Sequence, residues 1–283
     1  MSSGPEQSQI FAPGLLSGRA VLVTGGGTGL GRATALELAR CGASVTIAGR
    51  REDVLAQSAA EISAATDGRV GTVAGDVREV AGARGMVEGV LEREGRLDVL
   101  VNNAGGQFFS PAELIAAKGW RAVWRLNVEG MLNMAEAAFA LAFDRAGGGM
   151  IVNTTLSPHH GMPGMAHSGA ARAAVEALTR ELAERWASAG VSVAAVAPGT
   201  FDTEVMVKYP VPVRAGMARA VPVQRLGDVA EHAWLVSLLA SPLGRSFSGS
   251  VVTLDGARDN WCGPWPPPGL VDEAGEVPVE ERR

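Results

Sequence analysis

The sequence is poor in the side chains that most often carry out chemistry. Its 283 residues include one tyrosine, Tyr209, and two cysteines, Cys41 and Cys262. We expect two thiols so far apart to be free rather than bridged, because nothing in the sequence resembles a secretion signal. Cys41 is expected to be buried at the end of a helix, and we assign neither cysteine a catalytic role.

A basic surplus, long apolar runs and targeting signals are also lacking. The net charge of -5 and the pI of about 5.5 provide no positive field for nucleic acid or anionic membrane. No apolar run approaches the length of a membrane span. The N-terminus lacks the basic and apolar regions of a secretory signal, and the C-terminus, Glu281-Arg282-Arg283, differs from peroxisomal addresses. We therefore expect a cytoplasmic protein that acts on a small molecule and binds neither nucleic acid nor membrane.

What the chain does contain is an alternation of short apolar runs and helical segments. Hydrophobic residues make up 47% of it and charged residues 19%, a balance that argues against general disorder. Strands are expected at 20–24, 45–48, 70–75, 99–101, 150–154, 191–197 and 251–254. Helices are expected at about 32–40, 80–94, 119–145, 165–187 and 228–240. This alternation predicts an α/β fold, a doubly wound parallel sheet of the Rossmann type with helices on both faces.

The predicted domain occupies 18–256, with an N-terminal surface arm at 1–17 and a C-terminal tail at 257–283. The tail is rich in tryptophan and proline and too short to fold alone, so we expect it to pack on its own domain or on a neighbouring subunit. Residues 201–225 have little periodicity and several prolines, which is typical of a mobile flap.

A glycine-rich turn follows the first predicted strand. Gly25, Gly29 and Gly31 would allow a tight turn and a close backbone approach, and would leave a helix N-terminus pointing at a phosphate. Glycine turns are common, but this one lies between a strand and a helix, the context that dinucleotide binding requires. We therefore interpret the turn as a phosphate cradle.

The end of the second predicted strand bears on the choice of cofactor. Arg50 and Arg51 stand where a carboxylate would hold the ribose 2′-OH of NAD. Two cations suit a 2′-phosphate, so NADP(H) is the expected cofactor. The alternative is that both are solvated surface arginines.

These and later motifs resemble those of the short-chain dehydrogenase/reductase family. The motifs are TGGGTGLG at 24–31, Asp76-Val77, Asn102-Asn103-Ala104-Gly105, Asn127-Val128-Glu129-Gly130, Pro198-Gly199 and Asp255-Gly256. The resemblance implies that Asp76 and Val77 contact adenine and that Asn127 kinks its helix and holds a water. It also implies that Thr200 and Thr203 lie near the nicotinamide. The cofactor-binding residues expected from these motifs are Gly25, Thr28, Gly29, Leu30, Gly31, Arg50, Arg51, Asp76, Val77, Asn103, Ala104, Gly105, Arg172, Pro198, Gly199, Thr200 and Thr203.

Longer stretches narrow the resemblance. The segments at 11–18, 102–120 and 167–187 look like peroxisomal trans-2-enoyl-CoA reductase and its bacterial relatives, and bacterial citronellol-dehydrogenase-like proteins are similar too. The narrower likeness implies a role in fatty acid metabolism. Family membership implies a homo-oligomer, mostly a tetramer, formed through the long helices at about 119–145 and 165–187.

The chain departs from the family at its reactive serine, tyrosine and lysine. Aligned on Gly-Ala-Ala-Arg, it has Thr155 at the serine position, Ser168 at the tyrosine position and Arg172 at the lysine position. Oxidising an alcohol needs a base such as a tyrosine of lowered pKa, which neither serine nor arginine replaces. Reducing a C=C bond conjugated to a thioester is less demanding, because hydrogen-bond donors stabilise the enolate oxygen. With Asn127, these three residues form the candidate catalytic set.

Each of these residues also has an ordinary structural interpretation. Thr155 could cap a strand end, Ser168 could be a helix N-cap, and Arg172 could pair with Glu176 one turn on. The loop histidines, His159, His160 and His167, lack the spacing and the carboxylates of a metal site, so no metal is expected. His160 and His167 are further candidates for the acid that protonates the α-carbon, although loop histidines are more often solvated. We expect an acyl pocket to be lined, or the core to be filled, by the side chains of Phe108, Phe109, Met162 and Met165.

Three functions compete on this evidence. The first is an NADPH-dependent reductase of the C=C bond of a trans-2-enoyl-CoA thioester. The second is an NAD(P)-dependent alcohol or aldehyde dehydrogenase for a branched, terpenoid-like substrate, which would need another base. The third is a nucleotide-binding member that has lost catalysis and serves as a sensor or partner subunit. We expect the first, because that chemistry depends least on the missing tyrosine.

Overall fold

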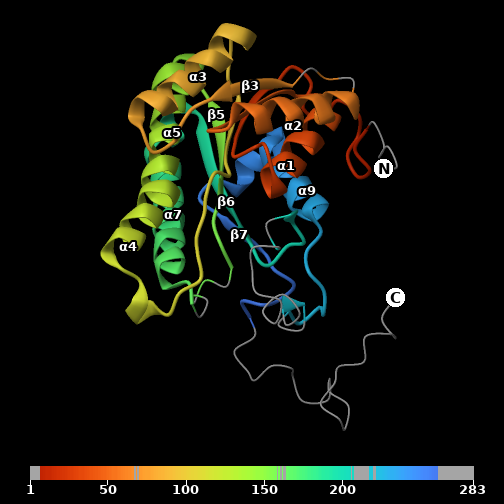
Figure 1. Cartoon of the computed structure of the whole chain (residues 1–283). Helices are drawn as coiled ribbons and strands as arrows, with labels where there is room; N and C mark the ends of the chain where they lie inside the picture. Colours follow the sequence, from red (N-terminus) through yellow and green to blue (C-terminus); the bar gives the residue numbers. More distant parts are fainter. Residues whose placement is uncertain are drawn as a thin grey trace.

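Seven parallel strands form one sheet at the centre of the molecule (Figure 1), in the spatial order β3-β2-β1-β4-β5-β6-β7. The strands are β1 (Ala20–Thr24), β2 (Ser44–Gly49), β3 (Gly71–Ala74), β4 (Val99–Asn102), β5 (Gly149–Thr154), β6 (Val191–Pro198) and β7 (Val251–Leu254). The computed structural model describes residues 7–66, 68, 70–157, 159, 161, 164–204, 206, 217–218 and 221–260. The predicted doubly wound parallel sheet is confirmed.

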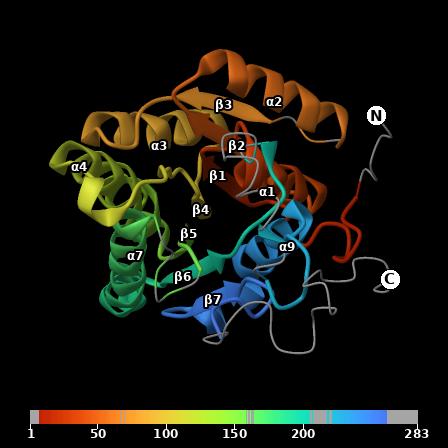
Figure 2. The ribbon, with the colours of Figure 1, turned by 60° about the horizontal axis from the view of Figure 1, so that its bottom comes forward.

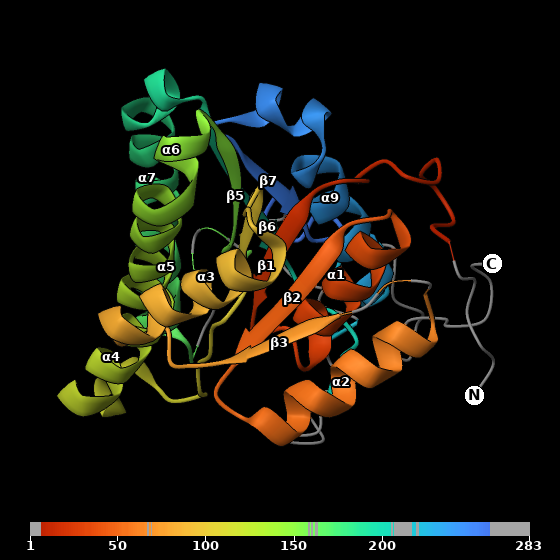
Figure 3. The ribbon, with the colours of Figure 1, turned by 90° about the horizontal axis from the view of Figure 1, so that it is seen from above.

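Helices cover both faces of this sheet (Figures 1 and 3). One face carries α1 (Gly29–Arg40), α2 (Glu52–Ala64) and α9 (Val229–Ala240). The other carries α3 (Val80–Glu94), α5 (Gly130–Ala138) and α7 (Ala166–Arg185). The shorter elements are α4 (Ala117–Trp124), α6 (Asp144–Ala146), the 3-10 helices η1 (Ala112–Leu114), η4 (Ala187–Ala189) and η6 (Pro242–Phe247), and the π-helical turns η2 (Arg125–Glu129) and η3 (Phe139–Phe143).

An apolar core lies on each face of the sheet. All eight residues of β6 are buried, as expected for a parallel strand with helices on both sides. Phe143 is fully buried on the face covered by α7. A Cβ at Gly149 would lie 2.3 Å from the Phe143 ring, so the glycine that opens β5 leaves room for that side chain.

A buried polar chain fixes α7 against the sheet. Asn102 Nδ2 donates to Asn153 Oδ1 at 3.0 Å, and Asn153 Nδ2 donates to Thr179 Oγ1 at 2.9 Å. These bonds join β4, β5 and α7. Because a buried polar group without its partner is unfavourable, they set the position of α7 along β5. The candidate catalytic residues at the start of α7 are placed by this contact.

The strand order reverses between β1 and β4, so the loops that follow these strands diverge and leave a crevice at their carboxyl ends. Figure 2 views the molecule from below Figure 1, with α4 and α7 on one side of the strands and α1 and α9 on the other. The segments that follow β1, β4, β5 and β6 all meet at the carboxyl ends of the strands. These segments carry the motifs singled out in the sequence.

Two helical regions differ from the sequence-based expectation. The patterns do not reveal α2, because its buried face mixes Ser58 and Ala59 with Leu55 and Ile62 and so has a weak apolar period. The helix predicted at 119–145 is interrupted, since π-helical turns separate α4, α5 and α6. A π-turn adds a single residue to one turn, a change too local for a periodicity that is averaged over many residues to show.

The described part of the N-terminal arm docks on the domain. Leu16 is fully buried, and its N–H donates to the Cys41 carbonyl at 2.8 Å. Cys41 is free and buried at the C-cap of α1, as expected. Burial, reinforced by the charge of Glu37, raises the pKa of its thiol to about 11, so it is not a thiolate nucleophile at neutral pH. Residues 261–283 of the predicted tail, Cys262 among them, lie outside the described residues.

Candidate active site

The glycine-rich turn between β1 and α1 forms an open cradle. Gly25 and Gly29 have φ angles of 65° and 53°, in the left-handed region that glycine adopts without strain. A Cβ at Gly31 would lie 2.3 Å from the Gly25 carbonyl oxygen, so any side chain there would displace the turn. Thr28 occupies the N-cap position of α1, but its side chain makes no capping hydrogen bond. The first N–H groups of α1 therefore face the cradle without a side-chain cap, as an anion site requires.

The end of β4 braces this cradle. Thr24 Oγ1 donates to the Val101 carbonyl at 3.2 Å and accepts from the N–H groups of Asn103 and Ala104, both at 3.0 Å. Asn103 Nδ2 donates in return to the Thr24 carbonyl at 3.0 Å. The structure thus brings the 102–105 motif, expected along the cofactor, into direct contact with the phosphate turn.

Two arginines stand at the end of β2. Arg50 and Arg51 are both exposed, and within the described part of the chain neither has a side-chain hydrogen bond or an ion pair. Arg51 is the N-cap residue of α2, and the charge of Arg50 helps to lower the pKa of Asp76. Arg50 therefore belongs to the surroundings of Asp76, and both guanidinium groups are available to a ligand.

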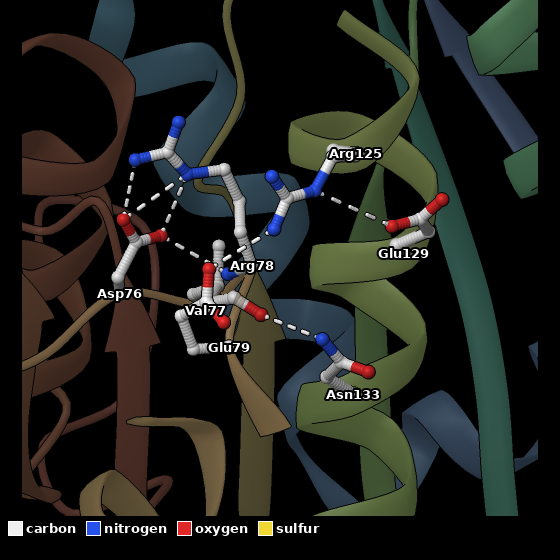
Figure 4. A network of polar contacts seen from close by, with 7 residues as sticks. All are labelled: Asp76, Val77, Arg78, Glu79, Arg125, Glu129 and Asn133. Carbon is white, nitrogen blue, oxygen red and sulfur yellow. Dashed lines mark hydrogen bonds and ion pairs between the residues drawn. The ribbon is translucent and has the colours of Figure 1, made fainter. Parts of the chain in front are cut away.

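Asp76 and Val77 belong to a polar network that reaches α5 (Figure 4). Arg78 Nε donates to Asp76 Oδ1 at 2.9 Å, and hydrogen bonding from Arg78 lowers the pKa of Asp76 to about 2. The Val77 carbonyl accepts from Asn133 Nδ2 at 3.0 Å. At neutral pH Asp76 is therefore an ionised, fixed acceptor, which suits an adenine amino group.

Asn127 is held from two sides inside η2. Its Oδ1 accepts from the Gly106 N–H at 3.1 Å, while its Nδ2 donates to the carbonyls of Gly106 at 2.9 Å and Val123 at 2.7 Å. The helix is π-helical at this residue, in agreement with the kink that the resemblance implies. Its binding of a water stays a prediction.

Arg172, on α7, is a buried cation that contacts the end of β5. Its Nη1 donates to the Thr154 carbonyl at 2.7 Å, whereas its Nε is buried and has no partner among the described residues. A Cβ at Gly105 would lie 2.4 Å from Nη2 and 2.8 Å from Asn127 Oδ1, so only a glycine admits the guanidinium here. Burial lowers the pKa of Arg172 to about 10, which leaves it charged at neutral pH.

The alternative partner that the sequence suggested for Arg172 is wrong, because Glu176 binds elsewhere. Glu176 Oε1 lies 2.6 Å from His159 Nδ1 and accepts from Thr155 Oγ1 at 3.4 Å. The Thr155 hydroxyl also lies 3.4 Å from the Val196 carbonyl. Glu176 therefore connects the buried Thr155 to His159, whose side chain is 28% exposed. The one signal for Glu176 in the sequence was its spacing, one turn beyond Arg172 on the same helix.

Ser168 is completely buried in the first turn of α7. Its Oγ lies 3.4 Å from Gln107 Oε1, a partner that sequence motifs did not indicate. It is not a helix N-cap, because α7 begins at Ala166 and Met165 holds the N-cap position. Within the described residues, no hydrogen bond links Ser168, Thr155 and Arg172 directly to one another, although all three lie at the carboxyl end of the sheet.

The segment after β6 approaches the cradle from the other side. A Cβ at Gly199 would lie 2.7 Å from Asp255 Cβ, so this glycine permits a close approach of the end of β7. The Thr200 carbonyl accepts from the Gly227 N–H at 2.9 Å. Thr203 faces the cradle, 4.0 Å from the position of a Cβ at Gly29. Pro198, the last residue of β6, precedes this turn.

A cavity of about 490 Å³ adjoins the cradle between α1, α2 and the segment after β6. Gly29 and Thr203 line it on the side of the phosphate turn. Arg32 crosses it, with Nη1 2.8 Å from Glu61 Oε2 and Nη2 against Glu204. The cavity thus begins where the glycine turn ends.

Some residues singled out in the sequence lie outside the described residues. They are Tyr209, His160 and Met162, together with Trp261 and Trp265 of the predicted tail. Of the other expected pocket residues, Met165 is buried, whereas Phe108 and Phe109 are exposed.

No group of three or more His, Cys, Asp or Glu side chains in the described ranges could hold a metal ion. Across the same ranges, no helix has both the length and the apolar character needed to cross a membrane.

Comparison with known proteins defines the class. The profile of the short chain dehydrogenase family matches residues 19–211. The chain is 35% identical over 253 residues to a probable 2,4-dienoyl-CoA reductase of Bacillus subtilis, covering 88% of this chain and 98% of the relative. It is 33% identical to a peroxisomal 2,4-dienoyl-CoA reductase of Danio rerio, covering 88% and 84%. The chain therefore belongs to the short-chain dehydrogenase/reductase family.

A solved structure is also similar to this chain. The citronellol catabolism dehydrogenase of Pseudomonas aeruginosa PAO1 has a TM-score of 0.79 with this chain and is 39% identical, over 90% of this chain and 99% of that one. The chain is an oxidoreductase of this family. The expected likeness to citronellol-dehydrogenase-like proteins is present, and the acyl-CoA reductases among these relatives are 2,4-dienoyl-CoA reductases.

Proposed function

We propose that the protein is an NADPH-dependent reductase of C=C bonds conjugated to an acyl thioester, with 2-enoyl-CoA or 2,4-dienoyl-CoA as its substrate class. The observation that carries the proposal is the buried guanidinium of Arg172, which has no carboxylate partner among the described residues and an unpartnered Nε. A fixed cation in such surroundings stabilises an oxygen that gains negative charge. The names of the relatives from Bacillus subtilis and Danio rerio support the substrate class.

The residues at the strand ends fit a phosphorylated dinucleotide. The uncapped N-terminus of α1 would hold the diphosphate, and the lack of a side chain at Gly31 lets the turn pack tightly beside it. Arg50 and Arg51 would hold the 2′-phosphate, and Asp76 would accept from adenine. When bound, NADPH supplies a hydride. The remaining members of the predicted set, from Asn103 to Gly105 and from Pro198 to Thr203, would line the cofactor.

The chain itself must hold the substrate oxygen and deliver one proton. Arg172 would hold the oxygen, beside the Asn127 side chain that the Gly106 N–H fixes by a hydrogen bond. A proton can pass from solvent through His159 and Glu176 to the Thr155 hydroxyl, along contacts of 2.6 Å and 3.4 Å. From Thr155 it would reach the α-carbon, so that each turnover adds one hydride and one proton to the double bond.

The test is NADPH oxidation with trans-2-enoyl-CoA and 2,4-dienoyl-CoA substrates of short to long acyl chain. Deuterium from [4-²H]NADPH should appear on carbon in the product, on the β-carbon for an enoyl-CoA. A full panel without turnover would overturn the proposal. If NADPH still bound tightly, the result would favour a member of the family that has lost catalysis.

A second function is favoured by the likeness to the citronellol catabolism dehydrogenase. An alcohol dehydrogenase needs a base, and Glu176, acting through Thr155, is the carboxylate in the described residues that could serve as one. Oxidation of citronellol with NADP⁺, without turnover of any thioester, would establish this second function in place of the first.

A further inference from the structure

His167 is a fully buried imidazole without a hydrogen bond. It lies in the first turn of α7 with 1% of its surface exposed, and neither ring nitrogen has a partner among the described residues. Buried polar side chains in proteins are nearly always hydrogen-bonded, because an unmade bond is unfavourable. A ring with two unpartnered nitrogens is therefore unusual enough to indicate a missing ligand.

Two aromatic rings pack on this imidazole. The Phe108 ring lies edge to face with a centroid distance of 4.3 Å, and the Trp120 ring does so at 6.1 Å. Phe108 comes from the loop between β4 and α4, and Trp120 from α4, which lies beside α7 (Figures 1 and 2). Phe108 and Trp120 are 43% and 37% exposed, so a single layer of rings separates His167 from solvent.

The aromatic cover adjoins the candidate active site. Ser168, the next residue, lies with its Oγ 3.4 Å from Oε1 of Gln107, the residue before Phe108. The lack of a side chain at Gly119 leaves room for the Phe108 ring, because a Cβ at Gly119 would lie 2.8 Å from that ring. The exposed Phe108 ring therefore lies between solvent and His167, close to Ser168.

The chemistry of the ring restricts what it can bind. A neutral imidazole has one N–H donor and one acceptor nitrogen. A thioester carbonyl would use only the donor, and a terpenoid chain offers no polar group. The pantetheine arm of an acyl-CoA carries secondary amides, each with an N–H and a C=O, joined by methylene groups. Its amides would satisfy both nitrogens, and its methylenes would pack on the aromatic rings.

We propose that His167 binds the pantetheine arm of the acyl thioester, with Phe108 and Trp120 as the apolar walls of that subsite. The inference rests on the proposed function and specifies how the site would tell a CoA thioester from a plain alcohol or ester. His167 is then a specificity-determining residue, whereas Arg172 acts on the reacting end of the same substrate.

The test uses two thioesters of one enoyl group, one with pantetheine and one with ethanethiol. The wild-type protein should turn over the pantetheine thioester with a kcat/KM at least about 10-fold higher, the size of effect that hydrogen bonds to an amide provide. His167→Phe should lower kcat/KM for the pantetheine thioester by about 10-fold and leave the ethanethiol thioester unchanged. His167→Gln, which keeps a donor and an acceptor, should recover part of the loss.

Stability and control variants separate binding from structure. His167→Phe removes two unpartnered buried nitrogens, so its melting temperature should not fall. Trp124→Phe, an exposed aromatic on the same helix as Trp120, should leave the ratio of the two kcat/KM values unchanged. An equal loss on both thioesters would overturn the inference and indicate that His167 is structural or is the acid that protonates the α-carbon. A wild-type protein that does not distinguish the two thioesters would also overturn it, whether or not the variants fold. If no thioester is turned over at all, the proposed function fails, and this inference fails with it.

Discussion

Arg172 is buried and charged, and it has no counter-ion among the residues that the structure describes. Its contact with the Thr154 carbonyl satisfies one nitrogen, and its Nε has no partner within the described part of the chain. Burying a cation in this way is unfavourable unless an anion arrives. The folded protein is therefore expected to give up stability at this position in return for binding, which is common at active sites.

Replacing Arg172 with methionine should separate these two effects. Arg172→Met keeps most of the volume and removes the charge, so the melting temperature should rise or stay level while kcat/KM for an enoyl-CoA falls by roughly 100-fold or more. Arg185→Met, an exposed arginine on the same helix, is the matched control and should change neither. Activity close to wild type in Arg172→Met would show that the substrate oxygen is held elsewhere.

A second prediction at the scale of single residues concerns Arg50 and Arg51 and the choice between NADPH and NADH. Because both are exposed and unpaired within the described residues, they are available to a 2′-phosphate, and NADPH should bind at least about tenfold more tightly than NADH. The double substitution to alanine should bring the two dissociation constants together, while Arg84→Ala on α3 should not. Fluorescence titration with both nucleotides measures this, and equal dissociation constants for the wild-type protein would contradict the assignment of NADP(H).

Among the elements, α1 and α9 pack together around a buried histidine. His232 on α9 lies with Nδ1 3.3 Å from Thr34 Oγ1 on α1, and its Nε2 has no partner in the described residues. Burial lowers the pKa of His232 from 6.5 to about 4. The unfolded chain therefore binds a proton at this histidine between those two pH values, whereas the folded chain does not.

The sign of the resulting pH dependence follows from this difference. The stability that depends on neutral His232 is fully present above about pH 6.5 and is lost progressively as the pH falls toward about 4. Between about pH 7 and pH 5 the free energy of unfolding should drop by about 2 kcal/mol more in the wild-type protein than in His232→Leu. Urea unfolding at both pH values measures the difference. Parallel losses in the two proteins would show that other groups carry the acid sensitivity.

At the scale of the whole molecule, the remaining expectation is that copies of the chain form a homo-oligomer. The 20-residue helix α7 exposes Ala170, Ala173 and Ala177, whose spacing of three and four places them on one face. Small side chains on such a face allow a second helix to approach closely. We expect a homotetramer that uses this face and the neighbouring region of α5.

Light scattering on the purified protein tests that expectation. The mass should be close to four times the 29.2 kDa of one chain. Ala173→Arg should lower it, because an arginine keeps the helices apart, whereas Ala56→Arg on the exposed face of α2 should not. A wild-type mass of one chain would contradict the assembly.

Much of the fold could be predicted because its signals are local. The buried strands are continuous apolar runs, and the phosphate cradle is a glycine pattern between a strand and a helix, so both are visible within a few residues. The helix α2 was missed for the same reason, since serine and alanine on its buried face weaken the local pattern. The residue pattern also did not show the π-turn at Phe139–Phe143, because such a turn changes hydrogen bonding without changing composition, whereas the kink at Asn127 was expected from the family resemblance alone.

The sequence by itself determined the parallel sheet and the cradle, and it placed a serine at position 168. Only the tertiary structure decided the partners of the polar groups: Glu176 for Thr155, Gln107 for Ser168, and no carboxylate in the described residues for Arg172. The physical reason is that these contacts join residues far apart in the chain. Their distances depend on how α7 packs on β5 and on the loop after β4, which no local pattern encodes.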